Sequence, residues 1–145
     1  MCVGCDIHGP WLYTRQKIMT GATLGTYYTR CRATFHWERD YDVFALLANV
    51  RNDNRYVSIS EPRGWPSVEW FGGHDPWEME DHGDSDGCHS ASWVSTDELV
   101  GAQKFYTSIG DGNPSQDMMH AITMMRGYEH AYPNTEVRLV FCFDD

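Results

Sequence analysis

An Asp-x-His pair near the start of the chain has residue types that could do chemistry. The segment reads Cys5-Asp6-Ile7-His8-Gly9, and on an extended backbone Asp6 and His8 point to the same side. A carboxylate and an imidazole placed this way can chelate a divalent metal, or the carboxylate can orient the imidazole as a general base. The same spacing also suits a polar pair that caps a turn, so the motif alone leaves these roles open.

A second cluster gathers histidine, carboxylate and thiol groups in residues 82–90. It places Asp84, Asp86 and His89 shortly before a predicted helix that starts at Ser95. The free backbone amides at the start of a helix favour anions. The cluster is therefore a candidate metal or anion site, and the alternative interpretation is a solvated acidic loop.

Arg63 stands between two residues that restrict the backbone, Pro62 and Gly64, and Trp65 follows them. A guanidinium held in a defined place can bond two oxygens of a phosphate or carboxylate, and an aromatic neighbour can stack on a flat ligand. This segment therefore predicts an anion site. The alternative is that Arg63 pairs with an acid of the acidic central part of the chain or with Glu61.

Two sets of candidate site residues follow from these segments. A nucleotide-like anion would be held by His8, Arg63, Trp65, His89, Trp93 and Ser95. A divalent metal, the one cofactor that the sequence suggests, would be held by Asp6, His8, Asp84, Asp86 and His89. A third arrangement is a structural zinc site made of Cys2, Cys5 and His8, completed by Cys88 and His89.

The charge balance restricts the partners. The 145-residue chain has 21 acidic and 11 basic residues, a net charge of −10, and more than half of the acids lie in residues 51–100. This balance disfavours extended binding to nucleic-acid phosphates, whereas a small anion needs only one or two well-placed arginines. No apolar run reaches the roughly 20 residues of a membrane span, and no signal segment is recognised. A cytoplasmic protein is therefore expected, and a homo-oligomer is compatible with the sequence.

The five cysteines are expected to be free thiols. Their number is odd, and the chain shows no sign of secretion. Because the reducing cytoplasm keeps most thiols unpaired, a disulfide framework is not expected.

The pattern of apolar residues predicts an α+β fold. A single compact domain over residues 1–145 is expected, with an antiparallel or mixed sheet, about three helices and a long ordered central loop. Strands are predicted at 10–19, 26–37, 55–60 and 136–143. The last strand is expected to be central because apolar residues lie on both of its faces.

Helix starts are indicated by capping residues. A first helix is predicted from Asp40 or Asp42 to the residues before Asn52, and a third from Ser115 to before Pro133. The second is predicted to start with a capping box at residues 95–98 and to end near residue 104. Residues 61–92 are expected to form an ordered loop pinned by tryptophans.

Five segments together resemble a family of small phage and prophage proteins. The family has a Gly-Cys-Asp-Ile-His start, a helix with the pattern Arg-x-Tyr-x-x-Phe-x-x-Leu-Ala-x-Val-Arg, a Pro-Arg-Gly segment, a His-Ser-His-Ser-Trp segment and an apolar carboxy-terminal strand. The matching segments are Gly4–His8, Arg39–Arg51, Pro62–Gly64, His89–Trp93 and Val137–Phe143. Ala91 departs from the pattern, since the family has a second histidine there. The resemblance implies a phage origin and supplies no activity.

Three functions are compatible with these residues. The first is a phage protein that binds a small nucleotide-like anion and sequesters a signalling nucleotide of the host's immunity. The second is a metal-dependent phosphoesterase that cleaves such a nucleotide, with the metal activating water. The third is an acidic inhibitor of protein interactions, since residues 69–86 hold seven acids and no lysine or arginine. The departure at Ala91 favours binding over cleavage.

Overall fold

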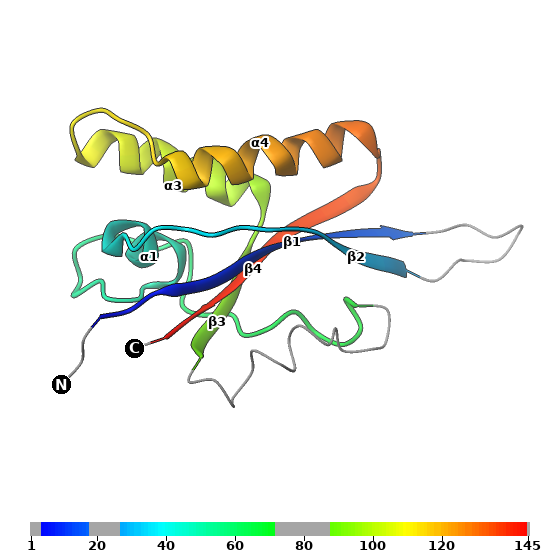
Figure 1. The fold of residues 1–145 in the computed structure, drawn as a ribbon, viewed down its shortest axis with the longest axis horizontal. Helices are drawn as coiled ribbons and strands as arrows, with labels where there is room; N and C mark the ends of the chain where they lie inside the picture. Colours follow the sequence, from blue (N-terminus) through cyan, green and yellow to red (C-terminus); the bar gives the residue numbers. More distant parts are fainter. Residues whose placement is uncertain (1–3, 18–26, 72–87, 145) are drawn as a thin grey trace, which may run out of the picture.

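A four-stranded antiparallel sheet lies at the centre of the part of the chain that the structure describes (Figure 1). The structure is a computed structural model, and it describes residues 4–17, 27–71 and 88–144. The strands are ordered β2-β1-β4-β3, so the first and the last strands of the chain are the two central ones. They span Ile7–Lys17 (β1), Tyr27–Thr34 (β2), His89–Val94 (β3) and Thr135–Phe143 (β4).

Three helices accompany this sheet in the described residues, which confirms the predicted α+β class. They are α1 (Tyr41–Ala48), α3 (Thr96–Ile109) and α4 (Gln116–Ala131). Each starts where the sequence predicts, because a side chain accepts the first free amides of the helix. Asp40 caps α1, Ser115 caps α4, and Ser95 forms the predicted capping box with Glu98.

Two helix ends differ from the prediction. α1 ends at Ala48 because Asn49 adopts a left-handed conformation with φ 60°, so residues 49–51, which the prediction included, lie outside the helix. α3 continues to Ile109, because Tyr106 remains tied to the body of the protein through a 2.7 Å hydrogen bond from its hydroxyl to Asp40.

The two faces of the sheet carry two apolar clusters. The helix-side cluster lies under α3 and α4 (Figure 1). From β4 it takes four residues that alternate along the strand, Val137, Leu139, Phe141 and Phe143. The tryptophan-side cluster lies on the opposite face and consists of Trp11, Tyr13, Trp70, Phe71 and Val140, with Trp65 and Trp93 packed against it. β4 is thus covered on both faces, as its apolar pattern predicts.

The strand predicted at 55–60 is wrong. Side-chain hydrogen bonds replace a strand ladder there: Asn52 accepts the Tyr56 N–H at 2.9 Å and donates to the Tyr56 carbonyl at 2.6 Å. The Ile59 N–H then reaches the Leu46 carbonyl of α1. This segment therefore packs against α1 instead of joining the sheet.

The predicted loop at 61–92 is partly correct. Trp70 and Phe71 are buried, so its first part is held by aromatic residues as expected. Its last residues instead begin β3, because Ser92 pairs with Phe141 of β4. Trp77 and the rest of residues 72–87 lie outside the described residues.

The expectation of free thiols is wrong for one pair, because Cys88 and Cys142 form a disulfide. The pairing of β3 with β4 brings their Cα atoms to 5.9 Å, a distance that a disulfide can bridge. Cys5 is buried and Cys31 is half-buried, and neither is in a disulfide.

Candidate functional site

A polar pocket of about 400 Å³, the His8 pocket, lies where the start of β1 meets the end of β4. Its lining combines three carboxylates, two histidines and one arginine: Asp6, Ile7, His8, Gly9, His36, Trp37, Glu38, Arg39 and Asp144. Strand pairing places these groups, since Ile7 lies opposite Phe143 and the Asp144 N–H donates to the Asp6 carbonyl at 2.9 Å. The residues after β2 complete the pocket.

His8 and Asp144 form the central pair of this pocket. The His8 Nε2 lies 2.5 Å from the Asp144 Oδ2, and the other carboxylate oxygen accepts the backbone N–H of Asp6 at 2.9 Å. The two side chains are 37% and 30% exposed, so a ligand can reach them. The Asp144 carboxylate, held in place by the backbone amide of Asp6, thus orients the His8 imidazole. The Asp-x-His motif predicts such a carboxylate–imidazole pair, but with Asp6 as the carboxylate.

Asp6 is bonded to Arg39 instead. The Arg39 guanidinium donates to both carboxylate oxygens, at 2.9 and 3.1 Å. This hydrogen-bonded partner lowers the pKa of Asp6 and in turn raises the pKa of Arg39. Gly4 makes room for the pair: a Cβ at Gly4 would lie 2.3 Å from the Arg39 Nη1. Both oxygens of Asp6 are therefore engaged by a cation of the chain itself.

The predicted metal ligands are not brought together by the described residues. His8 pairs with Cys142 and His89 with the next residue, Phe143, so the two histidines point to opposite faces of the sheet. Within residues 4–17, 27–71 and 88–144, no group of three or more His, Cys, Asp or Glu side chains is placed to hold a metal ion. Asp84 and Asp86 lie outside the described residues.

The disulfide removes Cys88 from the predicted structural zinc site. Cys88 is bonded to Cys142, so it offers no thiolate to a metal. Cys2 lies outside the described residues.

Arg63 is paired with an acid of the central part of the chain, as its alternative interpretation states, and this acid is Glu98 instead of Glu61. Its guanidinium donates to the Glu98 Oε1 at 2.8 Å and the Oε2 at 2.5 Å, and also to the Trp93 carbonyl at 2.9 Å. Glu98 also accepts the Ser95 N–H at 3.0 Å. Arg63 and the Ser95 N–H at the start of α3 therefore both bind the Glu98 carboxylate, which belongs to the chain itself.

The predicted stacking residues are also engaged within the protein. The guanidinium carbons of Arg63 and Arg138 lie 4.5 and 3.6 Å from the centre of the Trp93 ring. Burial lowers the pKa of Arg138. Trp65 packs against Trp11 with ring centres 6.3 Å apart. These contacts cover much of the ring surface that a nucleobase would need.

His89 lines a separate pocket of about 300 Å³, the Ser90 pocket. This pocket is lined by Ala48, Asn49, Val50, Arg51, Glu61, Pro62, His89 and Ser90, and it shares no residue with the lining of the His8 pocket. Among the described residues, Asp6 and His8 share the lining of the His8 pocket, whereas His89 lines the Ser90 pocket.

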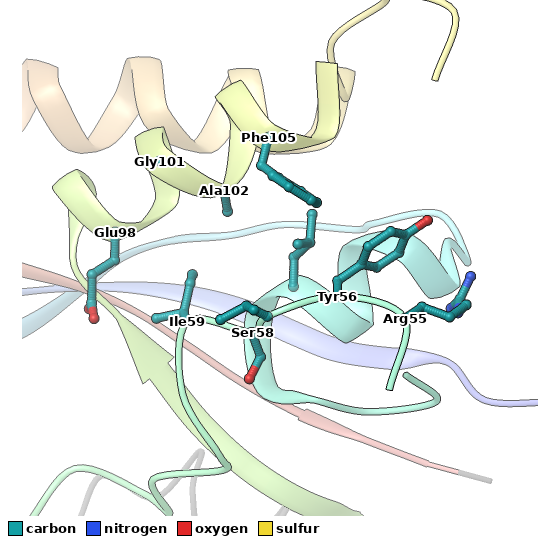
Figure 2. Close-up of a pocket in the computed structure, with 10 residues that line it drawn as sticks. Arg55, Tyr56, Ser58, Ile59, Glu98, Gly101, Ala102 and Phe105 are labelled. Carbon is teal, nitrogen blue, oxygen red and sulfur yellow. The ribbon is translucent and has the colours of Figure 1, made fainter. Parts of the chain in front are cut away.

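A third hollow, of about 470 Å³, lies between α3 and the segment 55–59 and is mostly apolar (Figure 2). Ile59, Ala102 and Phe105 lie around it, with Glu98 at one end and Arg55 at the other. Both charged groups are already paired, Glu98 with Arg63 and Arg55 with Asp42. This hollow could therefore hold an apolar group, but its two charged residues do not form an acid–base pair with each other.

Four titratable residues of the His8 pocket were missed from the sequence: His36, Glu38, Arg39 and Asp144. Arg39 is the first residue of the helix pattern on which the predicted resemblance to phage proteins rests, and that position was a usable signal. Asp144 is 136 residues from His8, and nothing local in the sequence connects them.

Comparison of the chain with protein-family models, with curated proteins and with solved structures finds no match. The resemblance to phage proteins therefore stays a prediction. In the described part of the chain, none of the helices combines the length and apolar character that a membrane crossing requires.

Proposed function

We propose that the protein is a hydrolase of small phosphorylated, nucleotide-like molecules, with His8 as the general base. The observation that carries the proposal is the 2.5 Å contact between His8 Nε2 and Asp144 Oδ2 in a pocket that a ligand can reach. When Asp144 accepts the Nε2–H, the neutral imidazole has its lone pair on Nδ1, where it can take a proton from water. The Asp144 carboxylate then stabilises the imidazolium that forms.

Two further groups of the His8 pocket suit a phosphoryl group. His36 and Arg39 line the pocket and are exposed, and both can donate N–H groups to phosphoryl oxygens. Arg39 is shared with Asp6, so an entering phosphate would compete with that carboxylate for the guanidinium. Substrate binding would therefore rearrange the Arg39–Asp6 pair and leave the His8–Asp144 pair in place.

Capture of the nucleotide without cleavage is the second candidate, and His36 and Arg39 favour it too. Asp6, Glu38 and Asp144 line the same pocket, and their negative charge weakens the binding of a resting anion. A divalent cation bound to the nucleotide would offset this repulsion, so both candidates are tested with and without Mg²⁺. Either activity would serve the counter-defence role expected of a phage protein.

The test is incubation of the protein with a panel of linear and cyclic nucleotides, followed by chromatographic separation of the products. We expect His8→Gln and Asp144→Asn each to lower turnover about 10²- to 10⁴-fold, because each removes one partner of the acid–base pair. His130→Gln is the matched control, since His130 is an exposed histidine in the last turn of α4 and does not line the His8 pocket. This control should leave turnover unchanged.

Further outcomes of this experiment distinguish the His8 pocket from Arg63 as the binding site, and hydrolysis from capture as the function. Arg63→Lys should leave turnover unchanged; if it abolishes binding while His8→Gln does not, the ligand lies at Arg63 and the assignment to the His8 pocket is wrong. A nucleotide that the protein binds and returns intact after denaturation would replace hydrolysis by capture.

A further inference from the structure

Ser90 has an unusual backbone conformation for a residue in a strand. Its φ is 55°, in the left-handed region that residues other than glycine rarely adopt. It lies in β3 at an irregularity of the pairing with β4, between His89 opposite Phe143 and Ser92 opposite Phe141. Such strain persists only where the surroundings hold it, and it occurs often at functional sites.

The segment around Ser90 is held on both sides. Before it, Cys88 is bonded to Cys142 of β4. After it, the Ala91 carbonyl accepts the Gly64 N–H at 2.7 Å, and the Ser92 hydroxyl accepts the Arg63 N–H at 3.1 Å. Ser90 is thus confined between two anchors, which explains how the left-handed conformation is maintained.

The side chain of Ser90 is bonded to a potential base. Its Oγ lies 2.9 Å from the Nδ1 of His89, within the range of a hydrogen bond. Both residues are half-buried, and both line the Ser90 pocket. Arg51 and Glu61, both in the same lining, carry opposite charges, and the Glu61 carboxylate already accepts a hydrogen bond from Asn49 at 2.8 Å. The Arg51 guanidinium can therefore bond an anionic group of a ligand in this pocket.

We propose that Ser90 is a nucleophile, activated by His89, that attacks small anionic esters in the Ser90 pocket. The Ser90 Oγ forms a bond to the acyl carbon while its proton passes to His89 Nδ1, and the bond from that carbon to the alcohol oxygen breaks. The imidazolium returns the proton to the departing alcohol. Water then cleaves the acyl-serine by the same proton transfers, releasing the acid. This site does not depend on the His8 pocket.

A fluorophosphonate probe tests the nucleophile without knowledge of the substrate. The serine oxygen displaces fluoride from phosphorus and leaves a stable adduct that intact-mass spectrometry detects and peptide mapping locates. We expect one adduct on Ser90 of the folded wild type, none on Ser90→Gly, and labelling at least about 100-fold slower for His89→Gln. Ser90→Gly is chosen because glycine adopts the left-handed conformation without strain, so the variant keeps its fold.

Ser58→Ala is the matched control, because Ser58 is also half-buried and lines the apolar hollow instead. It should be labelled at the wild-type rate. The proposal is overturned if the folded wild type carries no adduct on Ser90, if the adduct persists in Ser90→Gly, or if His89→Gln is labelled as fast as the wild type.

Discussion

The guanidinium of Arg63 is bonded to both oxygens of Glu98, and one of these oxygens also accepts the Ser95 N–H. These bonds lower the pKa of Glu98 from 4.5 to about 2, and the hydrogen bond from Arg63 is the largest cause. The folded protein therefore binds this proton less readily than the unfolded chain. The pair stabilises the fold fully above pH 4.5, and its contribution is lost as the pH falls toward about 2.

We expect Glu98→Gln to reduce the acid sensitivity of the fold. Glutamine keeps the shape of the side chain and can still accept the Ser95 N–H, but it does not titrate in this range. Between pH 4.5 and about 2, the variant should lose about 1 kcal/mol less unfolding free energy than the wild type, because solvent screens a partly exposed pair. Urea unfolding across that pH range measures the difference. Identical pH dependence in the two proteins would contradict the role given to this pair.

At the scale of elements, β3 is a short edge strand that the disulfide ties to a central strand. Cys88 and Cys142 are 54 residues apart in sequence, so the bond closes a long loop. Cross-links of this kind stabilise chiefly by restricting the unfolded chain. The same bond lies beside both pockets, since Cys142 pairs with His8 and Cys88 precedes His89.

We expect Cys88→Ser to lower the free energy of unfolding by about 2–5 kcal/mol. Thermal unfolding with and without a reductant provides the measurement. Reductant should lower the midpoint of the wild type toward that of the variant and leave the variant itself unchanged. Cys31→Ser is the control, since Cys31 is a half-buried cysteine outside the disulfide, and it should keep the response to reductant. A wild type indifferent to reductant would show that the cross-link contributes nothing to stability.

Elements that depend on neighbouring residues were predictable. The caps at Asp40, Ser95 and Ser115 act within one helical turn, so the sequence places these helix starts correctly. β3 forms by pairing with β4, which lies about 50 residues later in the chain. The residues of β3 alone therefore do not indicate which strand it pairs with. For the same reason the disulfide was missed, because only the β3–β4 pairing brings its two cysteines together.

The site was predictable to a smaller extent than the fold. The Asp-x-His motif pointed to His8, which lines the His8 pocket, but the carboxylate that contacts His8 is Asp144, from the other end of the described chain. Arg63 was correctly read as a fixed cation near a helix start, yet Glu98 of that helix supplies the anion. Residue types reveal which groups can interact, whereas the sheet order decides which of them meet.

At the scale of the whole molecule, the two apolar clusters share one sheet, and β4 contributes Leu139 to one and Val140 to the other. Leu139→Ala should lower the free energy of unfolding by about 2–5 kcal/mol and Val140→Ala by at least about 1.5 kcal/mol, because both side chains are fully buried.

Since neighbouring residues of one strand link the two clusters, we expect both variants to unfold in a single transition. Four of the six tryptophans, Trp11, Trp65, Trp70 and Trp93, lie in or against the tryptophan-side cluster, whereas Trp37 belongs to the helix-side cluster, so fluorescence is measured in a Trp37→Phe background. The fluorescence is compared with far-ultraviolet circular dichroism, which follows the helices on the other face. Coincident midpoints support one cooperative unit. A fluorescence change that precedes the loss of helix in Val140→Ala would show that the tryptophan side of the sheet unfolds independently.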